Sequence, residues 1–265
     1  MAKANRYSQI IEATFIKYFK KGMREINFNR EEIIATAAKL KIDLPKNIGD
    51  LLYSFRYRTD LPETIVAKAP EGFEWIIKSV GRASYKMVLI RQTNFKPTEN
   101  LAETKIPDAT PGIISMYAMS DEQALLAKVR YNRLIDIFTG LTCYSLQNHL
   151  RTTVPDIGQV ETDEIYIGID KRGFHYIIPV QAKGKSDKIG VVQIEQDFAI
   201  GKAKFPALFC KPIAAQFMNN GVIALFEFEL NNFSDIVISS EKHYRLVKPD
   251  ELSQEELDKY KNRTN

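Results

Sequence analysis

The sequence contains few of the residues that covalent crosslinks and metal clusters require. Its 265 residues include two cysteines, three histidines and one tryptophan. The cysteines, Cys143 and Cys210, lie far apart in apolar stretches. A disulfide framework and a structural zinc site are therefore not expected, and two reduced thiols are typical of a cytoplasmic protein.

Long apolar runs and several well-known catalytic motifs are also missing. No stretch approaches the 18 apolar residues of a transmembrane helix, and the first residues lack an apolar core before a small-residue cleavage site. We therefore expect no membrane association and no secretory signal. A Gly-rich phosphate-binding loop, a Gly-x-Ser-x-Gly elbow and a Gly-x-Gly-x-x-Gly fingerprint are absent. Readings as an NTPase, a serine hydrolase or a dinucleotide enzyme therefore lack support.

The composition is that of a globular protein, with an uneven distribution of charge. Apolar residues make up 45% and charged residues 26%, which excludes a disordered or fibrous chain. Residues 1–95 hold 17 Lys and Arg against 10 Asp and Glu, whereas the other 170 residues hold 20 against 23. All of the basic excess thus lies in the first third, which indicates an acidic partner such as nucleic acid.

The first third shows three helical patterns and then two strands. Helices are expected over residues 6–21, 30–40 and 46–58, and Asn29 is a plausible N-cap for the second of them. Strands are expected over residues 73–78 and 84–91, joined by a turn at 79–83. This order is similar to that of a winged helix-turn-helix domain, here residues 1–95. A module that contacts only protein is the alternative.

The winged-helix resemblance implies a DNA-binding surface. The third helix would enter the major groove, and cations on the two-stranded wing would meet phosphates. The residues assigned to this surface are Lys46, Asn47, Arg56, Tyr57 and Arg58 on the helix, and Lys78, Arg82 and Lys86 on the wing.

The rest of the chain predicts a linker, a mixed α/β domain and a charged tail. Residues 96–112 contain Pro97, Pro107 and Pro111 and have the composition of a linker. A helix is expected over 120–139, with Ser120, Asp121 and Glu122 at its start. Strands are expected at 159–169, 174–182, 206–216 and 221–229, with a helix at 190–200 after the second strand. The α/β domain is set at residues 113–245 and the tail at 246–265.

Polar residues gather at one end of the two predicted strands 159–169 and 174–182. Glu161 and Asp163 share one face of the first strand, and Gln181 and Lys183 share one side of the second. If the strands pair as a hairpin, these four side chains converge at the end of the sheet.

That pattern resembles the active-site core of the PD-(D/E)XK nuclease superfamily, which includes most type II restriction endonucleases. Asp163 matches the first acid and Gln181-Ala182-Lys183 matches the second motif, and a polar helix with Gln193-Ile194-Glu195-Gln196-Asp197 follows. The resemblance covers residues 120–200. It implies an α/β fold of the α+β kind, with a mixed sheet flanked by helices, and a Mg²⁺-dependent cleavage of phosphodiester bonds.

The resemblance also implies roles for the residues. Asp163 would be the main metal ligand, with Gln181 and Glu122 as further ligands, and Glu161 would be another catalytic carboxylate. Lys183 would orient the attacking water or stabilise developing negative charge. Lys185, in the basic loop after Lys183, would contact a phosphate.

The sequence departs from the family pattern at Gln181, where a neutral amide replaces the usual acid. An amide oxygen can bind a metal, but without charge. Weaker metal affinity, compensation by Glu161 and loss of catalysis all remain open. The literal Pro155-Asp156 pair competes with Asp163 for the role of first acid, but residues 155–158 have the composition of a turn.

We therefore expect a type II restriction endonuclease that cuts double-stranded DNA as a homodimer in the prokaryotic cytosol, near the nucleoid. One alternative is an inactive nuclease-like domain that serves dimerisation or ligand sensing behind a DNA-binding winged helix. A second alternative is a structure-specific repair or junction nuclease, which differs in its substrate and not in its site.

Overall fold

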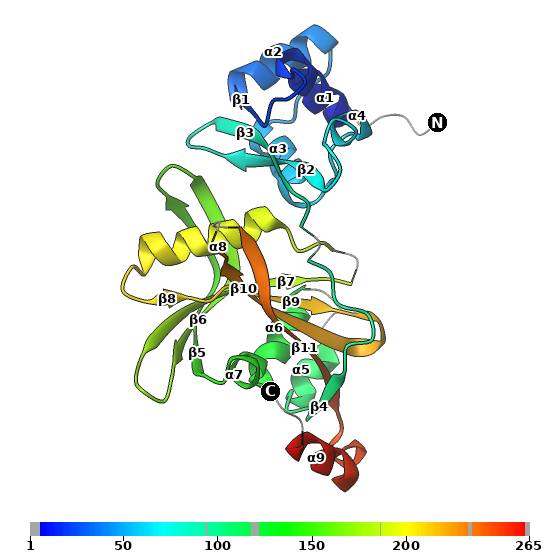
Figure 1. Ribbon diagram of the computed structural model, residues 1–265, viewed down its shortest axis with the longest axis vertical. Coiled ribbons are helices and arrows are strands. Elements are labelled where there is room, and N and C mark those ends of the chain that lie inside the picture. Colours follow the sequence, from blue (N-terminus) through cyan, green and yellow to red (C-terminus); the bar gives the residue numbers. More distant parts are fainter. Residues whose placement is uncertain (1–5, 94, 118–121, 186, 233–234, 263–265) are drawn as a thin grey trace. The chain divides into compact units, whose positions relative to one another are not determined.

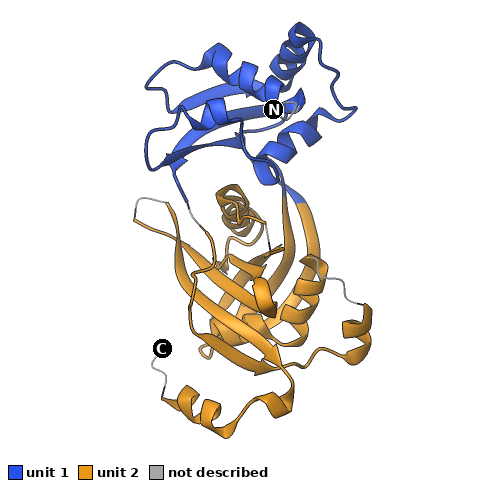
Figure 2. Ribbon diagram, turned by 90° about the vertical axis from the view of Figure 1, so that its right-hand side faces the viewer, with its two compact units in different colours: residues 1–94, 152–160 blue, residues 95–151, 161–265 orange. Residues whose placement is uncertain are grey.

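The computed structural model describes residues 6–93, 95–117, 122–185, 187–232 and 235–262. The chain divides into two compact units, which we call the first unit (residues 1–94 with 152–160) and the second unit (residues 95–151 with 161–265) (Figure 2). None of the helices in the described ranges is long and apolar enough to span a membrane.

The first unit combines four helices of its described residues with a three-stranded antiparallel sheet. The sheet has the order β1-β3-β2, and alternate side chains of each strand face the helices. Its core includes Phe15, Leu51 and Trp75. The elements are α1 (Arg6–Tyr18), β1 (Glu25–Asn29), α2 (Arg30–Leu40), α3 (Ile48–Tyr57), α4 (Glu63–Val66), β2 (Phe73–Ser79) and β3 (Ser84–Arg91).

Local capping fixes where two of these helices begin. The Asn29 side chain accepts a hydrogen bond from the Glu32 amide, and the Glu32 carboxylate accepts one from the Asn29 amide. This reciprocal capping box satisfies two amides that the first turn of α2 leaves unpaired, and it confirms the predicted N-cap. Asn47 caps α3 by accepting a hydrogen bond from Gly49.

The second unit is built on a mixed eight-stranded sheet, and its strands can be followed by their labels in Figure 1. The strand order is β4-β11-β10-β9-β7-β6-β5, and β8 pairs with β7 outside this path. Strand β9 runs parallel to β7 and β4 runs parallel to β11. The strands are β4 (Glu103–Pro107), β5 (Thr142–Val154), β6 (Gly158–Ile169), β7 (His175–Lys183), β8 (Phe209–Cys210), β9 (Ile213–Phe217), β10 (Val222–Leu230) and β11 (Ile236–Val247).

Helices cover both faces of this sheet (Figure 1). Leu125 of α6 and Leu134 of α7 pack with Val180 and Ala215 of the strands. Ile194 of α8 belongs to a separate core that holds the intervening residues of the same sheet. The expected mixed sheet flanked by helices is thereby confirmed. The helices are α5 (Gly112–Tyr117), α6 (Glu122–Tyr131), α7 (Leu134–Thr139), α8 (Val191–Lys204) and α9 (Gln254–Lys261), with 3₁₀ turns at Asn219–Gly221 and Pro249–Glu251.

One helix is expected over residues 120–139, but the described part of this range forms two helices. Its proposed start at Ser120 and Asp121 lies outside the described residues, and the rest forms α6 and α7 with a break between them. Asn132 causes the break, because its side chain bonds to Ala109 N, Thr110 Oγ1 and Lys128 O at 2.7–2.9 Å. Arg133 then adopts a left-handed conformation with φ of 51°.

Two other expectations also need correction. The segment 96–112 is not simply a linker, because it contains β4, which pairs in parallel with β11 at the edge of the sheet. The α/β body does not end at residue 245, because β11 continues to Val247. Residues 142–154 form a strand, β5, that is not predicted from the sequence, and residues 155–157 form the predicted turn.

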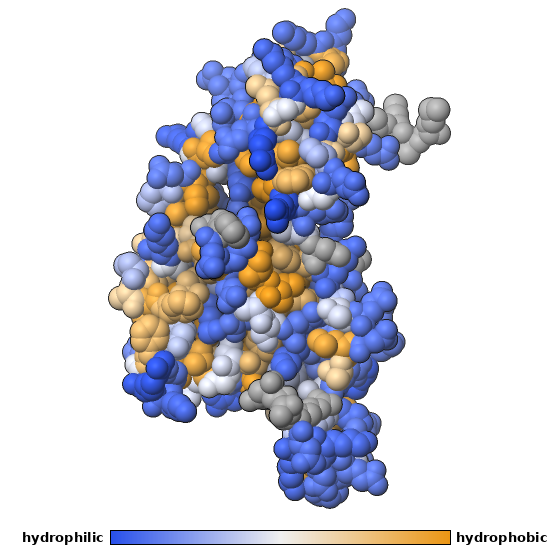
Figure 3. Space-filling model, viewed as in Figure 1, coloured by the Kyte–Doolittle hydropathy of each residue, from blue (hydrophilic) through white to orange (hydrophobic). Residues whose placement is uncertain are grey.

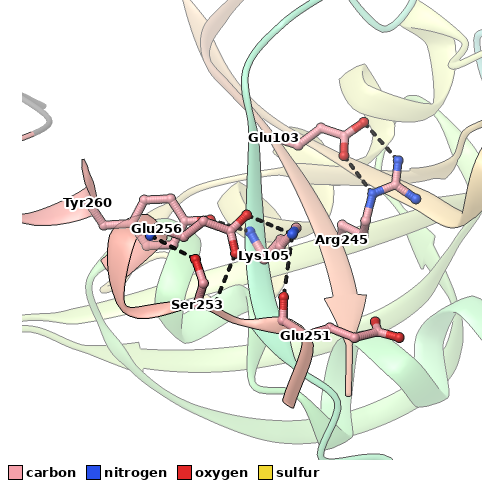
Figure 4. A network of polar contacts seen from close by, with 7 residues as sticks. All are labelled: Glu103, Lys105, Arg245, Glu251, Ser253, Glu256 and Tyr260. Carbon is pink, nitrogen blue, oxygen red and sulfur yellow. Dashed lines mark hydrogen bonds and ion pairs between the residues drawn. The ribbon is translucent and has the colours of Figure 1, made fainter. Parts of the chain in front are cut away.

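The charged tail is attached to β4 through a polar network (Figure 4). Lys105 Nζ lies 2.6 Å from Glu256 Oε1, and the Lys105 amide donates to the Tyr260 hydroxyl at 2.9 Å. Arg245 bonds both carboxylate oxygens of Glu103 at 2.6 and 2.9 Å. Helix α9 therefore covers the β4 edge, and its own surface is hydrophilic (Figure 3).

Candidate functional site

Asp163 lies just beyond the point where the backbone pairing of strands β6 and β7 ends. Their antiparallel pairing runs from Ile169 opposite His175 to Glu164 opposite Val180. One residue further, Asp163 Oδ2 accepts a hydrogen bond from the Ala182 amide at 2.8 Å. A side-chain carboxylate thus takes the place of a strand partner. Burial raises the pKa of Asp163, and the Ala182 amide and the Lys183 charge partly offset this effect.

Lys183 reaches the same place from the end of β7. Its Nζ atom lies 3.7 Å from Glu122 Oε1, and the lysine is almost wholly buried. Burial raises the pKa of Glu122, Lys183 lowers it, and the charges of Asp163 and Asp187 raise it further. One ammonium group therefore faces several carboxylates in a partly desolvated setting, which is typical of catalytic sites.

The Gln181 side chain points to a buried acid on α8. Its Nε2 atom lies 3.0 and 3.1 Å from the two carboxylate oxygens of Asp197, and 3.4 Å from Glu161 O. Asp197 is fully buried, and desolvation raises its pKa well above the usual range. Because the amide nitrogen is held in this way, the Oε1 atom of Gln181 is directed away from Asp197. We call Glu122, Asp163, Gln181, Lys183 and Asp197 the Lys183 cluster.

Glu161 lies apart from this cluster in its contacts. Its carboxylate accepts two hydrogen bonds from Arg151, at 2.8 and 3.1 Å, and lies 3.4 Å from His149 Nε2. The charge of Glu161 nevertheless raises the pKa of Asp163, so the convergence of Glu161 with the other three residues stays a prediction. Asp156 lies in an exposed turn with φ of 63°, so the literal Pro-Asp pair does not join the cluster.

An ion pair on the opposite face of β6 holds helix α6 in place. Arg130 Nε donates to Glu164 Oε1 at 2.9 Å, and Ser145 Oγ lies 2.6 Å from the same oxygen. Glu164 is fully buried, so removal of Arg130 would leave an uncompensated charge in the interior. Because α6 begins at Glu122, this pair positions the carboxylate that faces Lys183.

The residues of the cluster offer oxygen ligands of the kind that magnesium prefers. Asp163 and Glu122 supply carboxylate oxygens, and Gln181 supplies an amide oxygen. Among the described residues, no group of three or more His, Cys, Asp or Glu side chains is arranged to hold a metal ion. A magnesium ion held by these oxygens would therefore have to keep several of its own waters.

Two acids near the site were missed as candidates from the sequence. Asp197 was seen only as part of a polar helix, and its partner depends on how α8 packs on β7. Asp187 accepts a hydrogen bond from Gly184 N at 3.0 Å. Gln216 donates to Gly184 O at 3.3 Å and to Asp187 O at 2.8 Å, so it fastens the loop that follows Lys183.

The residues expected to bind DNA differ in how accessible they are. Lys46, Arg58 and Arg82 of the first unit and Lys185 of the second are exposed. Lys86 is ion-paired with Glu25 at 3.0 Å, and Lys78 is half-buried. Two arginines lie over tyrosine rings of α3, Arg56 over Tyr57 at 4.8 Å and Arg58 over Tyr53 at 5.2 Å. Asn47 is engaged in capping α3.

Comparison with known proteins gives no further guide to the site. The chain matches no protein-family model, no curated protein and no solved structure.

Proposed function

We propose that the protein is a magnesium-dependent DNA endonuclease, of the kind that cuts a specific duplex sequence. The observation that carries this proposal is the Lys183 cluster. An acid at the parting of two strands, a lysine at the end of the second strand and a helix carboxylate meet at one partly buried point. Groups of these kinds can support phosphodiester hydrolysis, because the scissile phosphate and the attacking water both need charge stabilisation.

Each residue of the Lys183 cluster has a separate role in the proposed reaction. When bound at Asp163, Glu122 and the Gln181 amide oxygen, magnesium supplies positive charge and lowers the pKa of a bound water. Lys183 presents three N–H donors, which stabilise the charge that develops on the phosphate oxygens. The Asp163 carboxylate is oriented by the Ala182 amide, and Asp197 orients the Gln181 amide. The site is thus fixed before substrate arrives.

The first unit supports DNA binding in this proposal. Its elements run α1, β1, α2, α3, α4 and then the β2–β3 hairpin, an order similar to that of a winged helix, with the four-residue α4 added before the hairpin and β1 as a third strand beside β3. Lys46 and Arg58 at the two ends of α3 and Arg82 at the hairpin turn are exposed cations. They would contact the phosphate backbone, with α3 in the major groove. Two copies of the chain would provide the two sites that a double-strand cut requires.

A second candidate function has one observation in its favour. Gln181 is neutral, and its nitrogen is tied to a buried acid that burial keeps protonated more readily than usual. A cluster with this reduced charge fits an inactive nuclease fold that serves assembly or ligand sensing behind a DNA-binding unit.

Magnesium titration by calorimetry separates the two candidates. The enzyme predicts saturable Mg²⁺ binding that is lost in Asp163→Asn and retained in Asp156→Asn, a control that removes an exposed turn carboxylate. Binding that survives Asp163→Asn would place the metal elsewhere. The absence of Mg²⁺ binding, with or without duplex DNA, would favour the inactive fold.

A further inference from the structure

The two edges of the eight-stranded sheet are covered differently. At the β4 edge, the backbone amide of Lys105 donates to Tyr260 of α9, so the tail occupies hydrogen-bonding groups of the strand (Figure 4). At the other edge, β5 pairs with β6 on one side and has no strand partner on its other side among the described residues. An edge strand of this kind is a template for another strand.

The sequence of β5 lacks the features that protect edge strands. Residues 142–148, Thr-Cys-Tyr-Ser-Leu-Gln-Asn, contain no charged residue and no proline. Lysine, proline and short length are the usual devices that prevent edge pairing, and β5 spans 13 residues. Tyr144 and Leu146 are 58% and 53% exposed. They share one face of the strand, whereas Ser145 turns to the other face and contacts Glu164.

We propose that β5 pairs in antiparallel fashion with β5 of a second copy of this chain. A two-fold axis at Ser145 sets Tyr144 of each copy opposite Leu146 of the other, and Thr142 opposite Asn148. On the face that carries Tyr144 and Leu146, apolar residues then meet apolar residues and polar residues meet polar ones. On the other face Cys143 lies opposite Gln147, and no like charges face each other. The pairing is self-complementary, as a two-fold symmetric dimer requires.

The local conformation limits this pairing to the neutral part of the strand. His149 has φ of 51°, which interrupts regular strand geometry. Immediately beyond it, Arg151 is engaged with Glu161 of the neighbouring strand. The paired segment therefore ends near Asn148. The inference goes beyond the proposed function and does not depend on it, because the edge would pair whether or not the Lys183 cluster is active.

The test measures mass in solution by light scattering and sedimentation across a range of protein concentrations. The wild-type chain is expected at twice its 30.3 kDa mass. Leu146→Lys and Tyr144→Glu are each expected to raise the dimer dissociation constant at least about tenfold, because a charge is placed within the paired surface. Ile16→Lys is the matched control, since Ile16 is 59% exposed on α1, outside this strand.

Mixing the two variants tests the register directly. In the mixed dimer, the carboxylate introduced by Tyr144→Glu faces the ammonium introduced by Leu146→Lys, and the other pair is native. Mixed dimers should therefore form when neither variant alone does. Circular dichroism establishes that each variant is folded.

The other outcomes overturn the proposal. A wild-type monomer at all concentrations shows that β5 does not pair with a second copy. A dimer that resists both variants lies on another surface, and failure of the folded variants to dimerise when mixed rejects this register. Cleavage of DNA is measured separately, so an active monomer rejects the interface alone and an inactive dimer rejects the activity alone.

Discussion

At the scale of single residues, the predicted site has an amide, Gln181, where the resembled pattern has an acid. The Gln181 amide contacts a buried acid on α8, Asp197, at 3.0 and 3.1 Å. Position 181 could be read from the sequence, because strand alternation places it beside Lys183. Asp197 could not, because its role depends on which turn of α8 packs against β7.

The buried acid gives the protein a predictable pH dependence. The folded pKa of Asp197 is raised, so the unfolded chain releases this proton first, and stability falls as pH rises from about 4 towards the folded pKa. The Asp197→Asn variant has no carboxyl group to ionise here, so it does not lose stability in this way as pH rises. Relative to wild type, the variant should gain about 1.4 kcal/mol in free energy of unfolding for each unit of pKa elevation. Urea unfolding in EDTA between pH 4 and pH 9 measures the difference.

Asp170 supplies the control of opposite sign. The Phe174 amide lowers the pKa of Asp170, so its stabilisation is present above the unfolded pKa and is lost as pH falls. Asp170→Asn should therefore lose stability at neutral pH and approach wild type at low pH. A difference between Asp197→Asn and wild type that does not change with pH would contradict the raised pKa.

An exchange of the acid and the amide between positions 181 and 197 tests whether Gln181 and Asp197 interact, through its effect on stability and on Mg²⁺ binding. Gln181→Glu alone places two carboxyl groups against each other in the interior, and it should cost about 1–3 kcal/mol of stability. Adding Asp197→Asn restores one donor and one acceptor, and it should recover most of that loss. It should also tighten Mg²⁺ binding, because a charged carboxylate oxygen then replaces the neutral amide oxygen among the ligands of the proposed site. Urea unfolding and calorimetry measure the two effects, and a fully stable Gln181→Glu single variant would show that the two groups do not interact.

At the scale of helices and strands, most elements whose buried residues follow a clear period were predicted, whereas strands β1, β4, β5 and β11 were not. The β6 and β7 strands and helix α2 have buried faces, and their expected ranges are confirmed within a few residues. Strand β5 was missed because its residues from Tyr144 to His149 are all exposed, so burial imposes no alternation. Strand β4 was missed because it depends on β11, which follows it at long range.

The attachment of α9 to β4 predicts that the tail protects the backbone amides of β4 from hydrogen exchange. Tyr260→Phe removes the hydroxyl that accepts from the Lys105 amide, and Glu256→Gln removes the charge that pairs with Lys105 Nζ. We expect the first change to lower the free energy of unfolding by about 0.5–1.5 kcal/mol, and the second, at a solvent-exposed ion pair, to lower it by less. Hydrogen exchange at residues 103–107 should increase in both variants. Unchanged protection of this strand would show that the tail does not cover it.

At the scale of the whole molecule, the basic excess of residues 1–95 predicts electrostatic binding of DNA. Lys46→Ala and Arg82→Ala should each weaken binding of any duplex and reduce the slope of log affinity against log salt concentration by about 1. Lys86→Ala is the control, because Lys86 is already paired with Glu25. Fluorescence anisotropy at several salt concentrations gives the slopes. Equal slopes in all three variants and wild type would place the DNA elsewhere.

The most direct test of the central claim is cleavage of a mapped plasmid in Mg²⁺ by the wild-type protein and by Asp163→Asn, Lys183→Ala and Asp156→Asn, with EDTA controls. Methylated and unmethylated plasmid are both used, because modification of a target site can block or permit cutting. The account predicts discrete, EDTA-sensitive fragments from wild type and Asp156→Asn, and a loss of at least about 100-fold in rate for the other two variants. Intact plasmid in every form, or undiminished cutting by Asp163→Asn and Lys183→Ala, would contradict it.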